Sequence, residues 1–423
     1  VNMMWENKPI VAIGDPIATI ENGLILQKDN YDQQLLDNLN EFISKSKQDG
    51  TLDSLSNHWF SDTEPTKHPD YNTLTGENGI IKVAVTNSMK PMAYRKGDLF
   101  TGYEVDFLTR FAKEYGYKLD FQGMDFDALI PAVVTGKCDL GAASVSITPE
   151  RKQSVTFTDS HLTTESIAVV YQGIKQDESN TFINSISESF EKTFIRENRW
   201  KLIIDGIIIT ILISLLAIIF GTLLGFGLYM LKRSSVKLIR IIAINIARVY
   251  SRIIAGTPVV VILMLLFYVV FSSFSEISGV FVAVICFSLT FGAFVYDHMT
   301  VSVNSVDKGQ IEAAYALGYT KNKTFFKIIF PQSMSVFLPS YCAQAVELIK
   351  ATSVVGYIAV NDLTKMGDII RSNTYEAFFP LISTAVIYFL LTWALSSLLG
   401  LVKKHFEPKR RTIKKILKGV KNI

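Results

Sequence analysis

Hydrophobic residues follow two contrasting patterns along the chain. Residues 1–200 mix short apolar runs with polar stretches, whereas Ile, Leu, Val and Phe dominate residues 201–402. A bilayer crossing needs about 20 apolar residues. Five runs approach or exceed that length: Gly206–Met230, Ile253–Phe274, Ile277–Tyr296, Ser333–Leu348 and Phe378–Val402. The pattern predicts a multi-domain protein, in which an α/β region precedes an all-α membrane domain of five spans over residues 201–402.

The α/β region is predicted over residues 79–174. Strand-like runs alternate there with amphipathic helices. The strands are Ile81–Val85, Lys118–Phe121 and Cys138–Ala142, and the helices are Tyr103–Tyr115 and Phe126–Val134. Such alternation is typical of a parallel sheet that binds ligands at the carboxyl ends of its strands.

Residues 1–60 are predicted to be the end of a domain. A strand at Gly23–Gln27 is followed by a helix that ends at Gly50 and by a short helix that ends at Trp59. Residues 61–78 contain Pro65, Pro69 and Gly76, and we expect a linker that buries no core.

Residues 181–200 carry an apolar stripe at helical spacing. Phe182, Ile186, Phe190 and Phe194 recur every four residues. This pattern predicts an amphipathic helix ahead of the first span. Two placements are open: in the membrane interface, or against the preceding domain.

Lys and Arg are concentrated in every second connection between the predicted spans. Cytoplasmic loops of membrane proteins are enriched in these residues. They are plentiful between the first and second spans, between the third and fourth, and in the tail 403–423. We therefore expect these segments in the cytoplasm and residues 1–200 outside the cell. An exported N-terminus needs an upstream signal or span, so we expect further sequence upstream. The tail carries an apolar stripe and either lies on the anionic leaflet or is solvated.

Several classes of chemistry lack a signature. The net charge is +3, and the basic residues form no face suited to nucleic acid. The three cysteines and five histidines show no disulfide or metal-ligand spacing. A phosphate-binding G-x-x-x-x-G-K-[ST] loop and a nucleophile–base set are missing from the sequence. We expect no catalytic residues, no metal and no cofactor in this chain, and any ATP and Mg on a partner.

A polar segment of helix-forming residues, Gly309–Pro331, separates the third and fourth spans. It predicts two short helices joined by a turn at Gly318, where a left-handed residue is needed. Glu312 is expected in the first turn of the first helix, where its charge suits the helix dipole. The apolar sides of the two helices are Ile311, Ala314, Tyr315 and Leu317, and Phe325, Phe326, Ile329 and Phe330. The segment either docks a soluble partner or is an ordinary loop.

The spacing of Glu312-Ala313-Ala314, Gly318 and Pro331 resembles the coupling loop of ABC importer permeases. That resemblance implies docking on a separate ATPase subunit through Glu312, Ala313, Ala314 and Gly318. Gly256-Thr257-Pro258 and the stretch Glu347–Leu363 also resemble the polar-amino-acid permeases. The resemblance implies a bacterial cytoplasmic-membrane importer in which two five-span domains pair, either as a homodimer or with a second permease chain. Ala255 and Thr300 depart from the family, which commonly has arginine at both positions.

The stretches GYEVDF, MDFDALIPAVVTGKCDL and SVSITPERKQSVTFTD resemble the extracellular glutamine-binding family, in order. The resemblance implies that Arg151 binds a ligand carboxylate, Ser146 offers a hydroxyl, Ser144 a carbonyl and Phe126 an aromatic wall. Asn87 lies near an acidic position of that family. The alternative for Arg151 is a surface ion pair with Glu150 or Asp159. Residues 1–60 resemble the closing segment of the same proteins, whereas no second lobe follows Gly173.

Gln344 and Glu347 are polar residues within a predicted span and suggest a translocation pathway. Glu347 has an alternative partner in Lys350, three residues along the helix. Two other functions compete with an amino-acid importer: a sensor, and a ligand-gated ion channel of the glutamate-receptor type. Val354-Val355-Gly356-Tyr357 resembles a potassium filter, but Ile358 replaces the second glycine that such a filter needs.

Overall fold

The computed structural model describes residues 10–61, 63–171, 182–272, 274, 277–374 and 376–406. The chain divides into two compact units. One comprises Val1–Thr210, Val260–Ala283 and Ser353–Ala385, and the other comprises Ile211–Val259, Val284–Thr352 and Val386–Ile423.

The first unit contains an α/β lobe built on a five-stranded sheet with the order β7-β3-β8-β2-β9. The strands are β2 (Ile25–Gln27), β3 (Ile80–Thr86), β7 (Lys118–Met124), β8 (Leu140–Ala142) and β9 (Val155–Phe157). β3 runs parallel to β7 and β8, as predicted. The prediction of a wholly parallel sheet is wrong, because β2 inserts between β8 and β9 and runs antiparallel to both.

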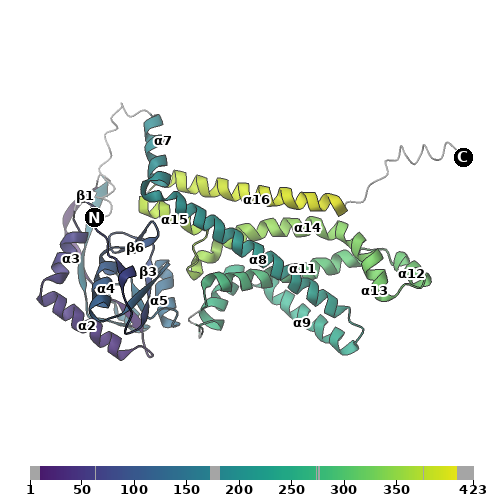
Figure 1. Cartoon of the computed structure of the whole chain (residues 1–423), viewed down its shortest axis with the longest axis horizontal. Coiled ribbons are helices and arrows are strands. Elements are labelled where there is room, and N and C mark those ends of the chain that lie inside the picture. The colour runs from purple at the N-terminus through teal and green to yellow at the C-terminus, as the bar shows by residue number, and fades with distance from the viewer. Residues whose placement is uncertain are drawn as a thin grey trace. The chain divides into compact units, whose positions relative to one another are not determined.

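Helices cover both faces of this sheet (Figure 1). They are α2 (Gln33–Gln48), α3 (Thr51–Trp59), α4 (Tyr103–Glu114), α5 (Phe126–Val134) and the short α6 (Pro149–Lys152). Phe42 of α2, Trp59 of α3 and Phe107 of α4 share one buried cluster with β2 and β3. On the other face, α5 packs through Leu129 and Val133. Residues 22–60 therefore complete the core of the lobe that residues 79–157 begin.

The segment 61–78 also contributes to this core. Tyr71, in the turn η1 (Tyr71–Thr73), is 9% exposed, and its ring centroid lies 4.8 Å from that of Phe121. Its hydroxyl accepts a hydrogen bond from the main-chain N–H of Phe100 at 2.8 Å. The expectation that this linker buries no core is wrong at Tyr71, because one aromatic ring is enough to join a core within a Pro- and Gly-punctuated segment.

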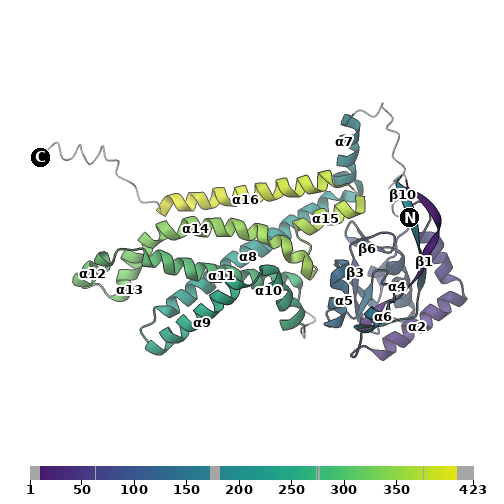
Figure 2. The same cartoon turned by 180° about the vertical axis from the view of Figure 1, so that it is seen from behind.

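Two further sheets were not predicted. β1 (Ile10–Asn22) and β10 (Leu162–Tyr171) pair antiparallel as a two-stranded ribbon, visible beside the N-terminus in Figure 2. β4 (Ser88–Met89), β5 (Ala93–Lys96) and β6 (Leu99–Thr101) form a small antiparallel sheet.

Three helices in the described residues are long and apolar enough to cross a membrane: Trp200–Lys232 (α8), Gly279–Asn304 (α11), and Phe378–Leu401 within α16 (Phe378–Phe406). Two bent pairs raise the number of spans to as many as five. In one pair, α9 (Lys237–Gly256) and the helical segment Val259–Val270 meet at a bend of 109°. That segment comprises α10 (Val259–Leu265) and the π-helical η4 (Leu266–Val270). The other joins Lys321–Ile358 to α15 (Leu363–Thr374) at 55°. Apolar helices of this length agree with the multi-pass membrane protein that the hydrophobic pattern predicts.

The second predicted span, Ile253–Phe274, is not a single helix. The chain breaks at Thr257-Pro258, because proline has no N–H to donate and disfavours a helical conformation in the residue before it. Two of the basic residues near the start of the second predicted span, Arg248 and Arg252, lie within α9.

Glycines bring α8 close to α11. A Cβ atom on Gly225 would lie 2.4 Å from the carbonyl oxygen of Gly292, and one on Gly221 would lie 2.8 Å from the Cβ of Phe291. Small residues let two membrane helices approach at backbone distance, and here they place α8 directly against α11.

The segment ahead of α8 forms α7 (Phe182–Phe190), a π-helical turn η2 (Glu191–Ile195) and η3 (Arg196–Asn198). The Phe190 ring contacts that of Phe379 at 6.1 Å between centroids, and Lys192 Nζ lies 3.9 Å from a carboxylate oxygen of Glu376. Phe190 of the stripe therefore contacts the start of α16, whereas Ile186 is 39% exposed. The side chain of Phe182 and the tail beyond Phe406 lie outside the described residues, so the predictions for both stay predictions.

Candidate functional site: a coupling segment and a ligand face

We call residues 309–331 the coupling segment. Its first helix is α12 (Lys308–Ala316), and Gly318 forms the turn that follows the helix. Gly318 has a φ of 77°, and its N–H donates to the carbonyl of Tyr315 at 2.9 Å. The N–H of Tyr319 donates to the carbonyl of Ala314 at 3.1 Å. These two bonds form a Schellman motif, which confirms the predicted helix end. Glu312, however, lies in the second turn, because α12 begins at Lys308, so the argument from the helix dipole is wrong.

The surface of α12 differs from the predicted apolar side. Ala314 is 2% exposed, whereas Tyr315 is 46% and Leu317 is 77% exposed. Glu312 and Ala313 are exposed beside them. Tyr315 near the end of α12 and Leu317 just after it therefore leave large apolar side chains exposed.

The second half of the coupling segment is continuous with a membrane helix (Figure 2). The short helix α13 (Lys321–Thr324) passes through a π-helical turn, η5 (Phe325–Ile329), into α14 (Phe330–Ala351). The expected separate second helix is thus the first part of the fourth span, and Pro331 lies where the π-helical turn passes into α14. Gln332 Nε2 donates to Gln310 Oε1 at 2.6 Å and joins this helix to α12.

Three of the predicted ligand residues come together at the carboxyl ends of β7 and β8. The Arg151 guanidinium lies 5.4 Å from the ring centroid of Phe126, the first residue of α5. Its Nη1 donates to the main-chain carbonyl of Ser146 at 3.1 Å. No ion pair of Arg151 with Glu150 or Asp159 is found among the described residues. Phe126, Ser146 and Arg151 are all half-buried and form the part of the lobe that we call the ligand face.

Ser144 is held by a residue that we did not predict. It has a φ of 51°, and its N–H donates to both carboxylate oxygens of the fully buried Glu104, each at 2.9 Å. Its hydroxyl donates to Asn22 Oδ1 at 3.3 Å. A signal was available, since Glu104 lies next to Val105 on the buried side of a predicted helix, and a buried carboxylate needs partners.

Asn87 follows β3 and is 2% exposed, and neither atom of its side-chain amide has a hydrogen-bond partner. A Cβ atom on Gly123 would lie 2.2 Å from Asn87 Oδ1. Asn87 therefore packs against β7, and no hydrogen bond of its side chain joins it to the ligand face.

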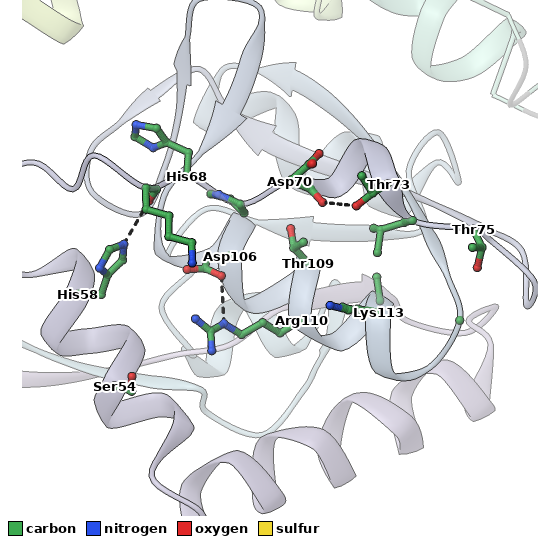
Figure 3. Close-up of a pocket in the computed structure, with 15 residues that line it drawn as sticks. Ser54, His58, His68, Asp70, Thr73, Thr75, Asp106, Thr109, Arg110 and Lys113 are labelled. Atoms are coloured by element: carbon green, nitrogen blue, oxygen red, sulfur yellow. Dashed lines mark hydrogen bonds and ion pairs between the residues drawn. The ribbon is translucent and has the colours of Figure 1, made fainter.

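A hollow of about 660 Å³ lies between α3, residues 67–75 and α4 (Figure 3). It contains none of the predicted ligand residues, and three of the titratable side chains that line it already have partners. Arg110 Nε lies 3.1 Å from Asp106 Oδ1, and Trp59 Nε1 donates to Asp106 Oδ2 at 3.1 Å. His58 Nε2 lies 3.3 Å from the carbonyl of Lys67. We therefore assign no ligand to this hollow.

Gln344 and Glu347 lie one turn apart on α14. Glu347 forms an ion pair with Lys350, which is the alternative partner that the sequence offered. Gln344 is half-buried. A role of either residue in translocation stays a prediction.

Two protein families match this chain, one over the membrane helices and one mainly over the α/β lobe. Residues 221–412 match the family described as binding-protein-dependent transport system inner membrane component. Residues 81–242 match bacterial extracellular solute-binding proteins, family 3. These matches confirm the fold class and the interpretation as a permease with attached solute-binding-protein sequence. Neither match supports an ion channel.

The chain is also similar to individual permeases. It is 32% identical over 207 residues to a putative glutamine transport system permease protein of Rickettsia conorii, covering 48% of this chain and 91% of that protein. It is 32% identical over 215 residues to an L-cystine transport system permease protein of Bacillus subtilis, covering 50% and 90%. An arginine transport system permease protein of Bacillus subtilis is 30% identical over 195 residues, covering 46% and 87%.

Among solved structures, an amino acid ABC transporter crystallised with histidines is 34% identical, with a TM-score of 0.44, covering 48% of this chain and 94% of that chain. The chain covers 91% of a permease relative that is 32% identical to it. This coverage, together with the match over residues 221–412, establishes the family. The chain belongs to the inner membrane components of binding-protein-dependent transport systems, the permease subunits of these importers.

Proposed function

We propose that this chain is the permease subunit of an ATP-driven importer of polar amino acids, with glutamine or glutamate as the first candidates. The matched relatives are named for glutamine, cystine and arginine, all of which carry the same α-amino and carboxylate groups. The coupling segment and the basic tail lie in the cytoplasm of a bacterial cell, and residues 1–200 lie outside.

The observation that carries this proposal is the exposed surface of the coupling segment. Glu312 and Tyr315 of α12, Leu317 just after it and Phe326 of η5 are exposed in a polar connection between membrane helices. A separate ATPase subunit that binds ATP and Mg covers this surface. Its closure moves α12 together with the helix that continues into α14, and two paired membrane domains, most simply two copies of this chain, then switch access from one side to the other.

ATP-driven uptake tests this function. The chain is co-expressed with its ATPase subunit, reconstituted into lipid vesicles and assayed with radiolabelled glutamine and glutamate. Glu312→Lys is expected to abolish uptake, because it reverses the charge on the docking surface. Glu165→Lys, an equal charge reversal on the exposed strand β10, serves as the control and is expected to preserve uptake. Ionic currents through the chain without an ATPase would refute the proposal.

The ligand face is proposed to receive the amino acid outside the membrane. Arg151 lies over Phe126, and its Nη1 donates to the main-chain carbonyl of Ser146. In this proposal the guanidinium binds the ligand carboxylate and the hydroxyl of Ser146 adds a hydrogen bond. A second lobe that would enclose the ligand is not found in the described residues, so we expect weak binding to an open face.

Calorimetry on the full chain in detergent tests this step with L-glutamine. Arg151→Lys is expected to weaken binding about tenfold or more, because an ammonium cannot bind a carboxylate in the bidentate geometry of arginine. Arg110→Lys, on the far side of the same lobe core, is the matched control. If the two variants bind L-glutamine with equal affinity, Arg151 does not take part in binding.

A further inference from the structure

One end of α8 packs on the second half of the coupling segment through three residues of a single helix face. Phe226, Tyr229 and Arg233 follow the spacing i, i+3, i+7, with Arg233 one residue beyond the helix end. The Phe226 ring lies 6.0 Å from that of Phe330, and the Tyr229 ring stacks on that of Phe325 at 6.1 Å and 29°. The Arg233 guanidinium lies 3.5 Å from the centroid of the Phe325 ring.

Phe325 is the centre of this contact. Its side chain is fully buried, whereas the adjacent Phe326 is 54% exposed. The distance of 3.5 Å places the planar guanidinium in stacking contact with the ring face, and Nη2 of Arg233 also reaches the carbonyl of Lys321 at 3.5 Å. Lysine cannot reproduce this arrangement, because an ammonium on a flexible stem lacks the flat, weakly hydrated surface that stacks on a ring.

The position of Phe325 makes the contact mechanically important. Phe325 begins the π-helical turn that joins α13 to α14, so it lies between the docking surface on α12 and a membrane helix. We propose that Arg233 is a positioning residue for coupling: by stacking on Phe325 it fixes α8 to the coupling segment, so that a displacement of this segment moves α8 and α14 together. This inference rests on the proposed function, because it presumes an ATPase that displaces the segment.

The test measures ATP hydrolysis and glutamine uptake on the same vesicles, with the chain and its ATPase reconstituted together. Arg233→Lys is expected to lower the uptake per ATP hydrolysed about threefold to tenfold while the ATPase subunit stays bound and active. Phe325→Leu should have the same effect, and Phe325→Trp should preserve coupling, since it retains a ring to stack on. Arg240→Lys, on an exposed position of α9, is the matched control.

A double-mutant cycle separates this role from a general loss of structure. If the stack acts as one unit, Arg233→Lys combined with Phe325→Leu is no worse than either change alone. Unchanged uptake per ATP in Arg233→Lys, or fully additive losses in the double variant, overturns the inference. Glu312→Lys is assayed in parallel: if it abolishes uptake while Arg233→Lys leaves coupling intact, the inference alone fails, whereas intact uptake in Glu312→Lys means that the proposed function fails.

Discussion

The carboxylate of Glu104 accepts the main-chain N–H of Ser144 on both of its oxygens, each at 2.9 Å. Ser144 has a φ of 51°, a left-handed conformation that is uncommon for a residue with a side chain. A buried acid therefore holds the turn after β8 in place, and this turn leads to Ser146 and Arg151.

Replacing Glu104 by Gln should destabilise the lobe by about 1–3 kcal/mol, because a buried group loses charge-assisted hydrogen bonds. Hydrogen exchange of the lobe amides in the solubilised full chain measures this loss. Glu114→Gln is the control on the same helix: its carboxylate is exposed and bonded to Lys45, so a change within about 0.5 kcal/mol is expected. Equal effects of the two variants would contradict the role of Glu104.

Gly225→Ala should disrupt the packing of α8 on α11. The added Cβ would lie 2.4 Å from the main-chain oxygen of Gly292, where only backbone movement can relieve the clash. We expect a loss of about 1–3 kcal/mol, measured as a lower midpoint of thermal unfolding in detergent. Gly227→Ala, two residues along the same helix, meets open space and should be neutral or slightly stabilising. A normal midpoint for Gly225→Ala would show that the two helices are not in close contact.

Substitutions of Gly318 should impair uptake in a defined order. Its φ of 77° is adopted freely by glycine, tolerated by asparagine and costly for other residues, by about 1–2 kcal/mol. Uptake in vesicles should therefore fall from Gly to Asn to Ala to Val. Hydrogen exchange at Tyr319, whose N–H closes the Schellman motif, should rise in the same order. If the uptake rate does not depend on the residue at position 318, the Schellman motif has no role in coupling.

Glu64 gives the lobe a pH dependence. Burial alone would raise the pKa of Glu64, but Lys90, Lys96 and the hydroxyl of Tyr94 together lower it below its usual value. A carboxylate with a lowered pKa in the folded state stabilises the fold above its unfolded pKa of about 4.3, and this stability is lost as pH falls through the folded pKa. Glu64→Gln should therefore cost about 1–3 kcal/mol at pH 7, and its difference from the parent should shrink as pH falls below the unfolded pKa of about 4.3 and through the lowered folded pKa. Unfolding by urea at several pH values measures this difference, and a constant gap would argue against the ionised contact.

Local pattern predicted the elements that depend on neighbours along the chain. The helices at Tyr103 and Phe126 and the end of α12 at Gly318 follow from helical spacing and from one residue with a left-handed conformation. Hydropathy alone did not distinguish a span from a bent helix pair. The average hydropathy of Ile253–Phe274 is little affected by the single residue Pro258. The missing N–H of this proline nevertheless breaks the helix.

Contacts between distant segments could not be predicted. Tyr71 joins the core because Phe121 lies opposite, and Asn22 reaches Ser144 because β2 enters the sheet beside β8. In the same way, the sequence showed Phe325 as part of an apolar stripe but not that Arg233 covers its ring, since the two are more than ninety residues apart.

The insertion of β2 between β8 and β9 has a consequence for the order in which the lobe forms. Residues 25–27 emerge from the ribosome more than a hundred residues before either of their strand partners exists. Helices α2 and α3 therefore have no surface to pack on until β3 and α4 have been made, and long-range pairing of this kind slows folding. The first segment of the lobe therefore stays without its packing partners during synthesis, and the apolar faces of its two amphipathic helices remain uncovered until β3 and α4 exist.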